Sequence, residues 1–346
     1  MGTNRIAAGR YDTDSFTDLA LLTNAGTSLN HGAYWLRNEN GVGLSLSLIA
    51  TTATGSAGKV VIVKGPAGSK DSVAALLSNG SLLGFSPYLP DAGTPSAGPV
   101  MVFSTASGTV HDISSARLPG WTQDGLVSTF STTSSQSVVT TYPGFASGQS
   151  TSLTQTVARQ WKSVASWRNW LMLATAQTTA SHAVTFPEDG GISLSPSLAS
   201  GIWKAAQEVD LLGDGVTQFF METSSYTLFE FPPGMPPSIV TPAQAVSVAR
   251  VDGGLPLGNA FAIGPYGPSL FGTSLFTLPD AGGVRQYRNF QKIGTSWRVD
   301  EVDRTDIANA GVPFVQAVLA DMNGDAINDL VLLEKAGNIR IYFSPP

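Results

Sequence analysis

The sequence predicts an all-β protein of repeated antiparallel hairpins. A seven-bladed β-propeller fits the repeat best, with six or eight blades as alternatives. Three observations support this prediction. Short apolar runs joined by small polar turns recur along the chain, an acidic loop occurs near each end, and helical periodicity is nearly absent. We therefore expect one domain over residues 1–346, with approximate blades at 5–57, 58–110, 111–158, 159–200, 201–243, 244–308 and 309–346.

The repeat is most easily followed from the start of the second strand of each expected blade. These starts recur about every 50 residues, apart from one interval of about 70. Stretches rich in Pro and Gly, such as LPDAGTPSAGP and FPPGMPP, lie between the units and indicate loops. The expected starts are Asp18, Asp71, Asp124, Asn169, Gln218, Asn259 and Asp329.

Composition excludes several classes of partner. The net charge is −6, and Lys and Arg form no cluster, so neither a nucleic acid nor an anionic membrane surface is an expected partner. The chain has no Cys, which excludes disulfides, thiol catalysis and cysteine metal sites. No apolar run approaches the ~20 residues of a membrane-spanning helix, so membrane insertion is not expected.

The content of Gly, Ser, Thr and Ala, together with scarce Lys, indicates a bacterial secreted or surface protein. The first residues, MGTNRIAAGRY, lack the apolar region of a signal peptide. We expect an extracellular or cell-surface location.

Two loops carry oxygen ligands at a regular spacing. In DMNGDAINDL these ligands fall at positions 1, 3, 5 and 9, and an apolar run follows directly. Near the N-terminus, RYDTDSFTDL has acids at positions 3, 5 and 9, with Arg10 at position 1. The candidate metal ligands are Asp321, Asn323, Asp325 and Asp329 in the last loop and Asp12, Asp14 and Asp18 in the first.

Both loops resemble the FG-GAP, or VCBS-type, repeat of integrin-α-like seven-bladed propellers, whose loop reads D-x-[DN]-x-D-G-x-x-D-L. Ala326 stands where that pattern has Gly. The resemblance implies Ca²⁺ in the acidic loops, in a structural role and above all in the 321–329 loop. The chemistry agrees, since Ca²⁺ takes six to eight oxygen ligands. An EF-hand is excluded, because Leu332 stands where its Glu is needed. The alternative is that Asp, Asn and Gly simply form a favourable turn.

No catalytic motif is present. The three histidines, His31, His111 and His182, have no paired metal spacing, and neither a nucleophile elbow nor a phosphate-binding loop occurs. The acidic run of Asp300, Glu301 and Asp303 is interpreted as a solvated strand edge or turn. A polysaccharide lyase or hydrolase with acids on one face remains an alternative, and the question of catalysis stays open.

Aromatic side chains favour a binding function. Trp or Tyr stacked on a sugar ring is a common carbohydrate anchor. Tyr34, Trp35 and Trp121 are the candidates, because each lies beside an expected turn. We therefore expect a calcium-stabilised, lectin-like module that binds a glycan. The alternative is an adhesion or scaffold propeller that binds a surface protein.

Overall fold

The computed structural model describes most of the chain in segments. The described residues are 5–12, 14–23, 32–39, 41, 43–51, 57–66, 70–77, 80–85, 101–102, 109–133, 136–145, 151–155, 161–168, 170–175, 181–185, 193–194, 203–222, 225–230, 244–252, 258, 260–268, 272–302, 307 and 311–345. They belong to two compact units, an N-terminal unit of Thr3–Ile202 and a C-terminal unit that includes Trp203–Pro346.

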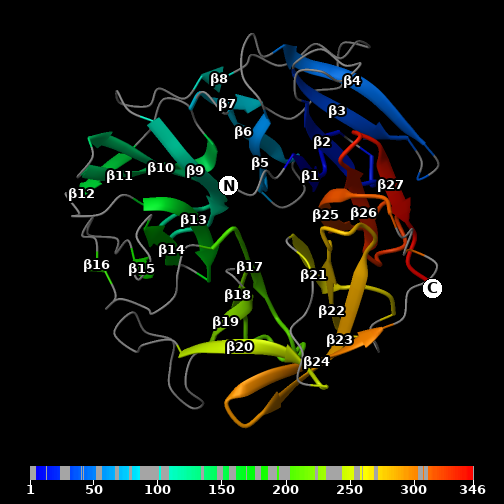
Figure 1. Ribbon diagram of the computed structural model, residues 1–346. Coiled ribbons are helices and arrows are strands. Elements are labelled where there is room, and N and C mark those ends of the chain that lie inside the picture. The colour runs from blue at the N-terminus through cyan, green and yellow to red at the C-terminus, as the bar shows by residue number, and fades with distance from the viewer. Residues whose placement is uncertain are drawn as a thin grey trace. The chain divides into compact units, whose positions relative to one another are not determined.

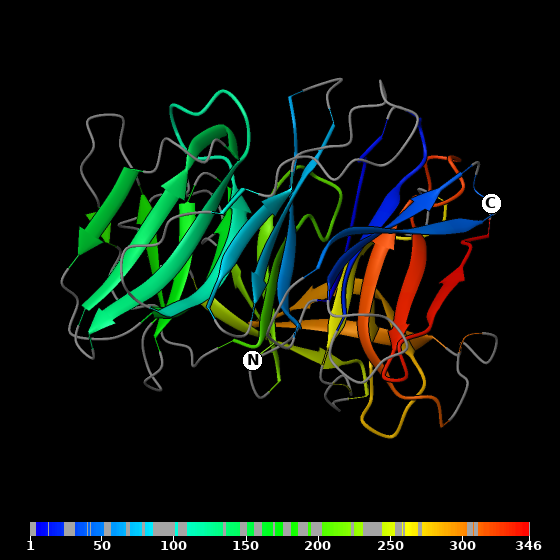
Figure 2. The same cartoon turned by 90° about the horizontal axis from the view of Figure 1, so that it is seen from above.

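The N-terminal unit contains four antiparallel sheets of four strands each, and within each sheet the strands are adjacent in chain order (Figure 1). The strands are β1 (Ile6–Gly9), β2 (Asp18–Thr23), β3 (Gly32–Asn38), β4 (Leu44–Thr51), β5 (Ala57–Val63), β6 (Ser72–Leu77), β7 (Leu82–Phe85), β8 (Met101–Val102), β9 (Thr109–Ala116), β10 (Gly125–Thr133), β11 (Gln136–Tyr142), β12 (Thr151–Gln155), β13 (Trp161–Trp167), β14 (Trp170–Thr175), β15 (Ser181–Thr185) and β16 (Ser193–Leu194). Figure 2 shows β9 to β12 side by side, coloured from turquoise to green.

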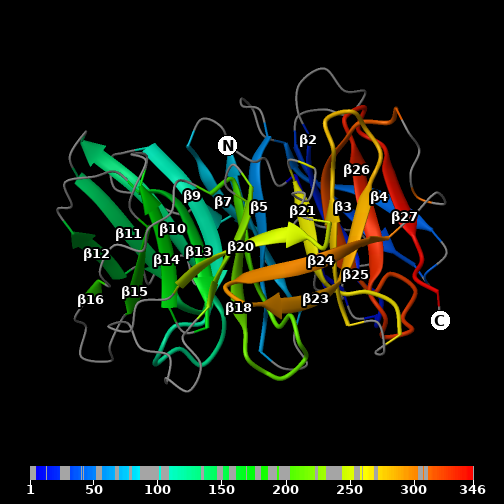
Figure 3. The same ribbon diagram turned by 60° about the horizontal axis from the view of Figure 1, so that its bottom comes forward.

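The C-terminal unit contains an eight-stranded sheet and a three-stranded sheet. The eight-stranded sheet has the order β17-β18-β19-β20-β24-β23-β22-β21, and its two antiparallel halves meet at a parallel pairing of β20 with β24 (Figure 3). Its strands are β17 (Ala205–Val209), β18 (Gln218–Glu222), β19 (Tyr226–Glu230), β20 (Gln244–Arg250), β21 (Phe261–Pro265), β22 (Thr273–Thr277), β23 (Arg285–Ile293) and β24 (Ser296–Val302); the last sheet holds β25 (Phe314–Ala320), β26 (Asp329–Glu334) and β27 (Ile339–Tyr342).

The hydrophobic cores lie between successive sheets of each unit. In the N-terminal unit, Trp35 of the first sheet packs in one cluster with Val73 of the second, and Val63 of the second packs in another with Phe130 of the third. In the C-terminal unit, Phe276 shares a cluster with Leu330. The second strand is therefore buried on both faces, as in β18, β22 and β26, where every residue is buried. Burial on both faces explains why these strands are continuous apolar runs in the sequence.

The antiparallel hairpins confirm the prediction of an all-β fold, but one expected strand start is wrong. The hairpin that begins after Asn259 consists of β21 and β22, so the second strand of that half-sheet begins at Thr273. With this correction the spacing to Asp329 resembles the others, and the long interval disappears. Among the described residues the one helix is the 3₁₀ turn η2 (Pro143–Phe145), and no helix there is long and apolar enough to cross a bilayer.

Candidate functional site

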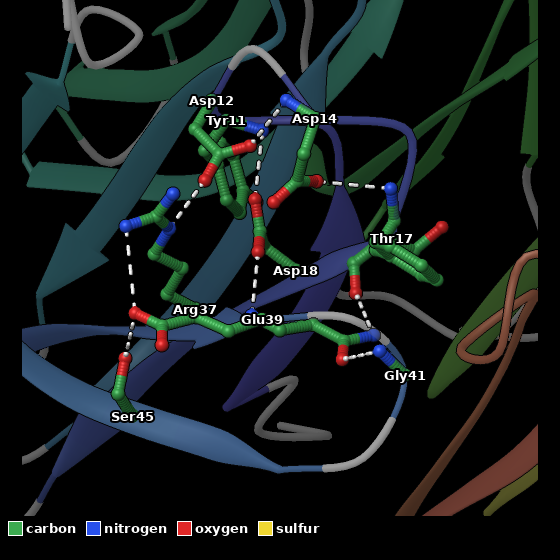
Figure 4. A network of polar contacts seen from close by, with 11 residues as sticks. Tyr11, Asp12, Asp14, Thr17, Asp18, Arg37, Glu39, Gly41 and Ser45 are labelled. Atoms are coloured by element: carbon green, nitrogen blue, oxygen red, sulfur yellow. Dashed lines mark hydrogen bonds and ion pairs between the residues drawn. The ribbon is translucent and has the colours of Figure 1, made fainter.

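The loop between β1 and β2 is held together by its acidic side chains (Figure 4). The backbone N–H of Asp14 donates to Oδ1 of Asp12 at 2.9 Å, and that of Phe16 donates to Oδ1 of Asp14 at 2.9 Å. Asp18 lies at the start of β2, fully buried, and accepts from the N–H groups of Tyr11 at 3.2 Å and Asn38 at 2.8 Å. Because Asn38 ends β3, Asp18 fastens the loop to the neighbouring strand.

Burial changes the acidity of this carboxyl group. Burial raises the pKa of Asp18 from 3.8 to about 6, and the charges of Asp12 and Asp14 add to the effect. The two backbone N–H groups act in the opposite direction, because they stabilise the carboxylate. Asp18 therefore has a structural role. Burial of its negative charge lowers the stability of the fold, and its two backbone hydrogen bonds partly offset this loss.

A cation from the protein already contacts this loop. Nε of Arg37, on β3, donates to Oδ2 of Asp12 at 2.7 Å, and Nη1 reaches Oε1 of Glu39 at 3.4 Å. The Asp12 side chain is 3 % exposed, so this is a mostly buried carboxylate neutralised by a half-exposed guanidinium. Arg37 thus supplies the positive charge that Ca²⁺ would supply in the loops of the FG-GAP repeat. Arg10 occupies position 1, where that repeat has an Asp ligand. The donor set of the first loop does not fit a calcium site.

The loop between β25 and β26 repeats the same contacts. The N–H of Asp325 donates to Oδ1 of Asn323 at 3.1 Å, and that of Ile327 donates to Oδ1 of Asp325 at 2.8 Å. Asp329, fully buried at the start of β26, accepts from the N–H groups of Met322 at 2.9 Å and Ser344 at 2.8 Å. Burial raises the pKa of Asp329 as well. The position-9 acid therefore has the same structural role in both loops.

The 321–329 loop differs at position 1. Asp321 accepts from the N–H groups of Gly324 at 2.7 Å and Ala326 at 2.8 Å, in an exposed part of the loop. Within the described segments, no Lys or Arg forms an ion pair with Asp321 or Asp325. Two uncompensated carboxylates and an amide oxygen in one exposed turn are the hard oxygen donors that Ca²⁺ prefers. The side chains present fit this ion by their chemistry, although the described residues hold no group of three His, Asp or Glu arranged as a preformed metal cluster.

A third loop, between β17 and β18, shows that the turn forms without the full ligand set. Asp210 accepts from the N–H groups of Gly213 at 2.7 Å and Gly215 at 2.8 Å, as Asp321 does in its own loop. Position 9 is Gln218, whose Oε1 accepts from the N–H of Leu211 at 3.1 Å. A neutral amide can therefore close this turn.

The two shorter loops of the N-terminal unit use their last acid differently. Asp71 accepts from the N–H groups of Gly65 at 3.2 Å and Arg10 at 2.9 Å, and so links the second sheet to the first. Asp124, at the corresponding place before β10, makes no such bond within the described segments. It faces a cavity of about 340 Å³ between the second and third sheets.

The structure contradicts the expected exposure of two of the three aromatic ligand candidates. Tyr34 and Trp35 are each 6 % exposed on β3, because sheets pack against one another and the strand has little free face. Trp35 contributes to the core between the first two sheets. Trp121 is half-buried and packs against the cluster between the third and fourth sheets. Of the three, only Trp121 is partly exposed.

A polar cluster that the sequence did not reveal joins three sheets of the N-terminal unit. Asp112 on β9 accepts from Nζ of Lys59 on β5 at 2.9 Å and from the N–H of Val164 on β13 at 2.8 Å. Nε2 of the neighbouring His111 lies 2.9 Å from Nζ of Lys162 and 2.6 Å from Oγ of Ser131. No sequence motif marks this cluster, since its members come from different hairpins.

The electrostatics of this cluster point to a structural role. Burial and the Lys162 charge lower the pKa of His111 to about 4, so the ring is neutral at neutral pH. A neutral imidazole beside a hydroxyl resembles a base and a nucleophile. However, the adjacent carboxylate of Asp112 is engaged by Lys59 and a backbone N–H, so it does not orient the ring. The cluster ties the sheets together.

The acidic run near β24 also forms ion pairs and hydrogen bonds that hold strands together. Glu301 pairs with Arg250 at 3.0 Å and with Arg285, and Asp300 accepts from the side chain of Asn289 at 2.9 Å. These contacts tie β24 to β20 and β23, in line with a strand-edge role. Asp303 lies outside the described residues.

Comparisons with known proteins identify the fold. No protein-family model and no curated protein matches the chain. A solved structure of BBS1N in complex with ARL6DN, from a crystal soaked with lead, matches with a TM-score of 0.61 and 11 % identity. The match covers 100 % of this chain and 93 % of that chain, and BBS1N is a β-propeller. The chain has a β-propeller fold. At this identity the likeness shows the fold alone.

In propeller terms, the acidic loops connect the first and second strands of a sheet. The β1–β2 and β25–β26 loops both do so, and each has its acid at the start of the second strand. The three loops thus share one turn design, with Asp at position 5 in each, and differ in the side chains at positions 1, 3 and 9 that decide their charge.

Proposed function

We propose that the protein is a seven-bladed propeller that serves as a binding module for a protein partner. The blade count is supported by the sheet pattern, if the eight-stranded sheet is divided at its parallel β20–β24 pairing. Each half then has four antiparallel strands, as do the sheets of the N-terminal unit. The last blade contributes the three strands β25 to β27.

The binding role is supported by the ionisable clusters, because their charged side chains form ion pairs within the fold. Asp12 is paired with Arg37, Asp112 with Lys59, and Glu301 with Arg250 and Arg285. Each pair ties strands or sheets together and leaves the loops and the cavity between sheets as the surfaces for a ligand. BBS1N, which shares the fold, was solved in complex with another protein, ARL6DN. This analogy supports a protein partner.

Calcium in the 321–329 loop is part of the proposal. The donors would be Asp321, Asn323 and Asp325, and the ion would neutralise a turn that has no cation of its own. Its role would be stabilisation, because all of these donors belong to one hairpin. We propose an extracellular or surface location as well, because extracellular modules typically bind calcium with affinities of 10⁻⁴–10⁻³ M, and a local, exposed site would fall in that class.

A glycan is the second candidate ligand, and Trp121 favours it. Its indole is half-buried against the third and fourth sheets, so part of the ring is available for stacking. The loop around it also carries Arg117, whose Nη2 donates to the backbone carbonyl of Thr122 at 3.0 Å.

One pair of assays separates the two ligands. The immobilised protein is used to capture partners from its source organism in calcium and in chelator, and captured proteins are purified and titrated individually. A glycan array is run under the same two conditions. A purified protein that binds saturably, with a blank array, supports the protein-binding role. Specific glycan hits that are lost in Trp121→Ala would instead establish the lectin role.

A further inference from the structure

A cavity of about 340 Å³ lies within the N-terminal unit, between the second and third sheets. One wall comes from the end of β5 and the loop that follows it, and carries Lys64 and Lys70. The other comes from the loop before β10 and from η2, and carries Gln123 and Asp124. Cavities of this size are at the lower end of those that hold small ligands.

The charged groups of the cavity are not paired with other described residues. Among the described residues, neither Lys64 nor Lys70 forms an ion pair, and Asp124 accepts no hydrogen bond. This is unusual here, because the equivalent acids Asp18 and Asp71 each accept from two backbone N–H groups. Two lysines and one aspartate give the cavity a local charge of about +1, in a chain whose net charge is −6.

The inner part of the cavity is apolar and fixed in position. Val63 and Phe145 are buried members of the core between the second and third sheets, and both line the cavity. Phe145 is held by a tight turn in which Gly144 and Phe145 have φ of 60° and 58°. The side chain of Gln123 donates to the carbonyl of Gly144 at 3.1 Å, which fastens the turn to the loop before β10 on the same wall.

We propose that this cavity binds the carboxy-terminal residue of a peptide whose last side chain is apolar. This inference rests on the proposed protein-binding role and names the part of the partner that is recognised. Lys64 and Lys70 would receive the terminal carboxylate, Asp124 would accept a peptide N–H, and the apolar side chain would lie on Val63 and Phe145.

The charge balance favours this ligand over a free amino acid, and the apolar surface favours it over an acidic sugar. A carboxy-terminal residue carries −1, which matches the cavity, and its N–H gives Asp124 a neutral donor. A free amino acid is neutral overall, so the second lysine would stay uncompensated. An acidic sugar has the required charge, but its hydroxyl groups would be placed on the apolar surface of Val63 and Phe145 without hydrogen-bond partners.

The test uses the full chain and a fluorescein-labelled peptide, Gly-Ser-Gly-Ser-Leu, in fluorescence polarisation. The free acid should bind saturably, and the carboxamide should bind at least about tenfold more weakly, because it lacks the charge that the lysines recognise. Lys70→Glu should weaken the free acid by at least about tenfold, and Lys335→Glu, an exposed lysine outside the cavity, should leave it unchanged. Asp124→Asn should have a smaller effect. Circular dichroism confirms that each variant is folded.

Several outcomes would overturn the inference. Equal binding of the acid and the amide, no effect of Lys70→Glu, or no binding of the free acid by the folded protein would each do so. Competition by glucuronate but not by N-acetyl-leucine would show that the cavity takes an acidic sugar instead.

The same variants separate this inference from the broader function. If a purified partner from the capture assay binds wild type and Lys70→Glu equally, the cavity inference fails and the protein-binding role stands. If the peptide binds and the capture assay gives no partner, the recognition chemistry stands and the broader role lacks support. If neither binds, both fail.

Discussion

The loop at residues 10–18 and the loop at residues 321–329 make matching backbone contacts but differ in charge compensation. In each, the acid at position 9 accepts from the N–H of position 2 and from an N–H at the end of the third strand or just beyond it. The first loop has Arg10 at position 1 and Arg37 on Asp12, whereas the last has Asp321 and no paired cation among the described residues. The acidic pattern therefore specifies a turn, and the residue at position 1 and a neighbouring cation decide whether the turn can also bind a metal.

The largest expected effect tests what the two loops share. Asp18→Ala and Asp329→Ala each leave two buried backbone N–H groups without an acceptor, so each should lower the free energy of unfolding by about 4 kcal/mol. Urea unfolding followed by tryptophan fluorescence measures this. Asp14→Ala, which loses one partly buried bond, should cost much less. Equal, small losses in all three variants would show that position 9 does not fasten the loops.

The next effect depends on pH. Since the pKa of Asp18 is raised to about 6 by burial, the folded protein binds a proton more tightly than the unfolded chain between pH 3.8 and about 6. This group therefore makes stability fall as pH rises through that window, by up to about 3 kcal/mol. Asp18→Asn should lower stability at every pH and flatten the slope in this range. An unchanged slope, measured by urea titrations from pH 4 to pH 7, would contradict the assigned pKa.

The third effect tests how the two loops differ. If the last loop binds calcium, an excess of about 100 times Kd should stabilise the protein by about 2.7 kcal/mol. Asp321→Asn combined with Asp325→Asn should abolish the shift. Asp12→Asn combined with Asp14→Asn should keep it, because Arg37 already neutralises the first loop.

Differential scanning fluorimetry in calcium and in chelator, supported by calorimetric titration of calcium, gives the readout. No shift in the wild type would remove calcium from the last loop. A shift lost in the Asp12 and Asp14 variant would reverse the comparison between the two loops.

The sequence predicted the parts of the fold that depend on local pattern. Asp12, Asp14 and Asp18 make hydrogen bonds that match those of Asn323, Asp325 and Asp329, as their sequence alignment predicted. This was predictable because an Asx turn needs only neighbouring residues. The β-strands were predictable for the same reason, since strands buried on both faces are continuous apolar runs. The strand start expected at Asn259 was wrong because the first and second strands of a sheet have similar apolar runs. Only the pairing of the strands distinguishes them.

The parts that escaped prediction depend on contacts between distant residues. Arg37 lies 25 residues from Asp12, and no spacing rule connects them. Tyr34 and Trp35 follow a turn, which suggested exposure, but the next sheet covers β3. Asp112 and Lys59 lie in different hairpins 53 residues apart. Such pairs appear only once the sheets are packed.

The smallest expected effect compares the last loop with the loop at residues 210–218. Position 6 has a positive φ in both, 80° at Gly215 and 65° at Ala326, and its N–H donates to the position-1 Asp in each. A left-handed backbone costs Ala about 1–2 kcal/mol, while Gly adopts it freely but loses more entropy on folding. Ala326→Gly should therefore stabilise the protein by up to about 1 kcal/mol, and Gly215→Ala should destabilise it by a similar amount. Urea unfolding of both variants measures the pair. If Ala326→Gly destabilises while Gly215→Ala also does, the two turns are not equivalent, and Ala326 must be held by contacts that the hydrogen bonds do not reveal.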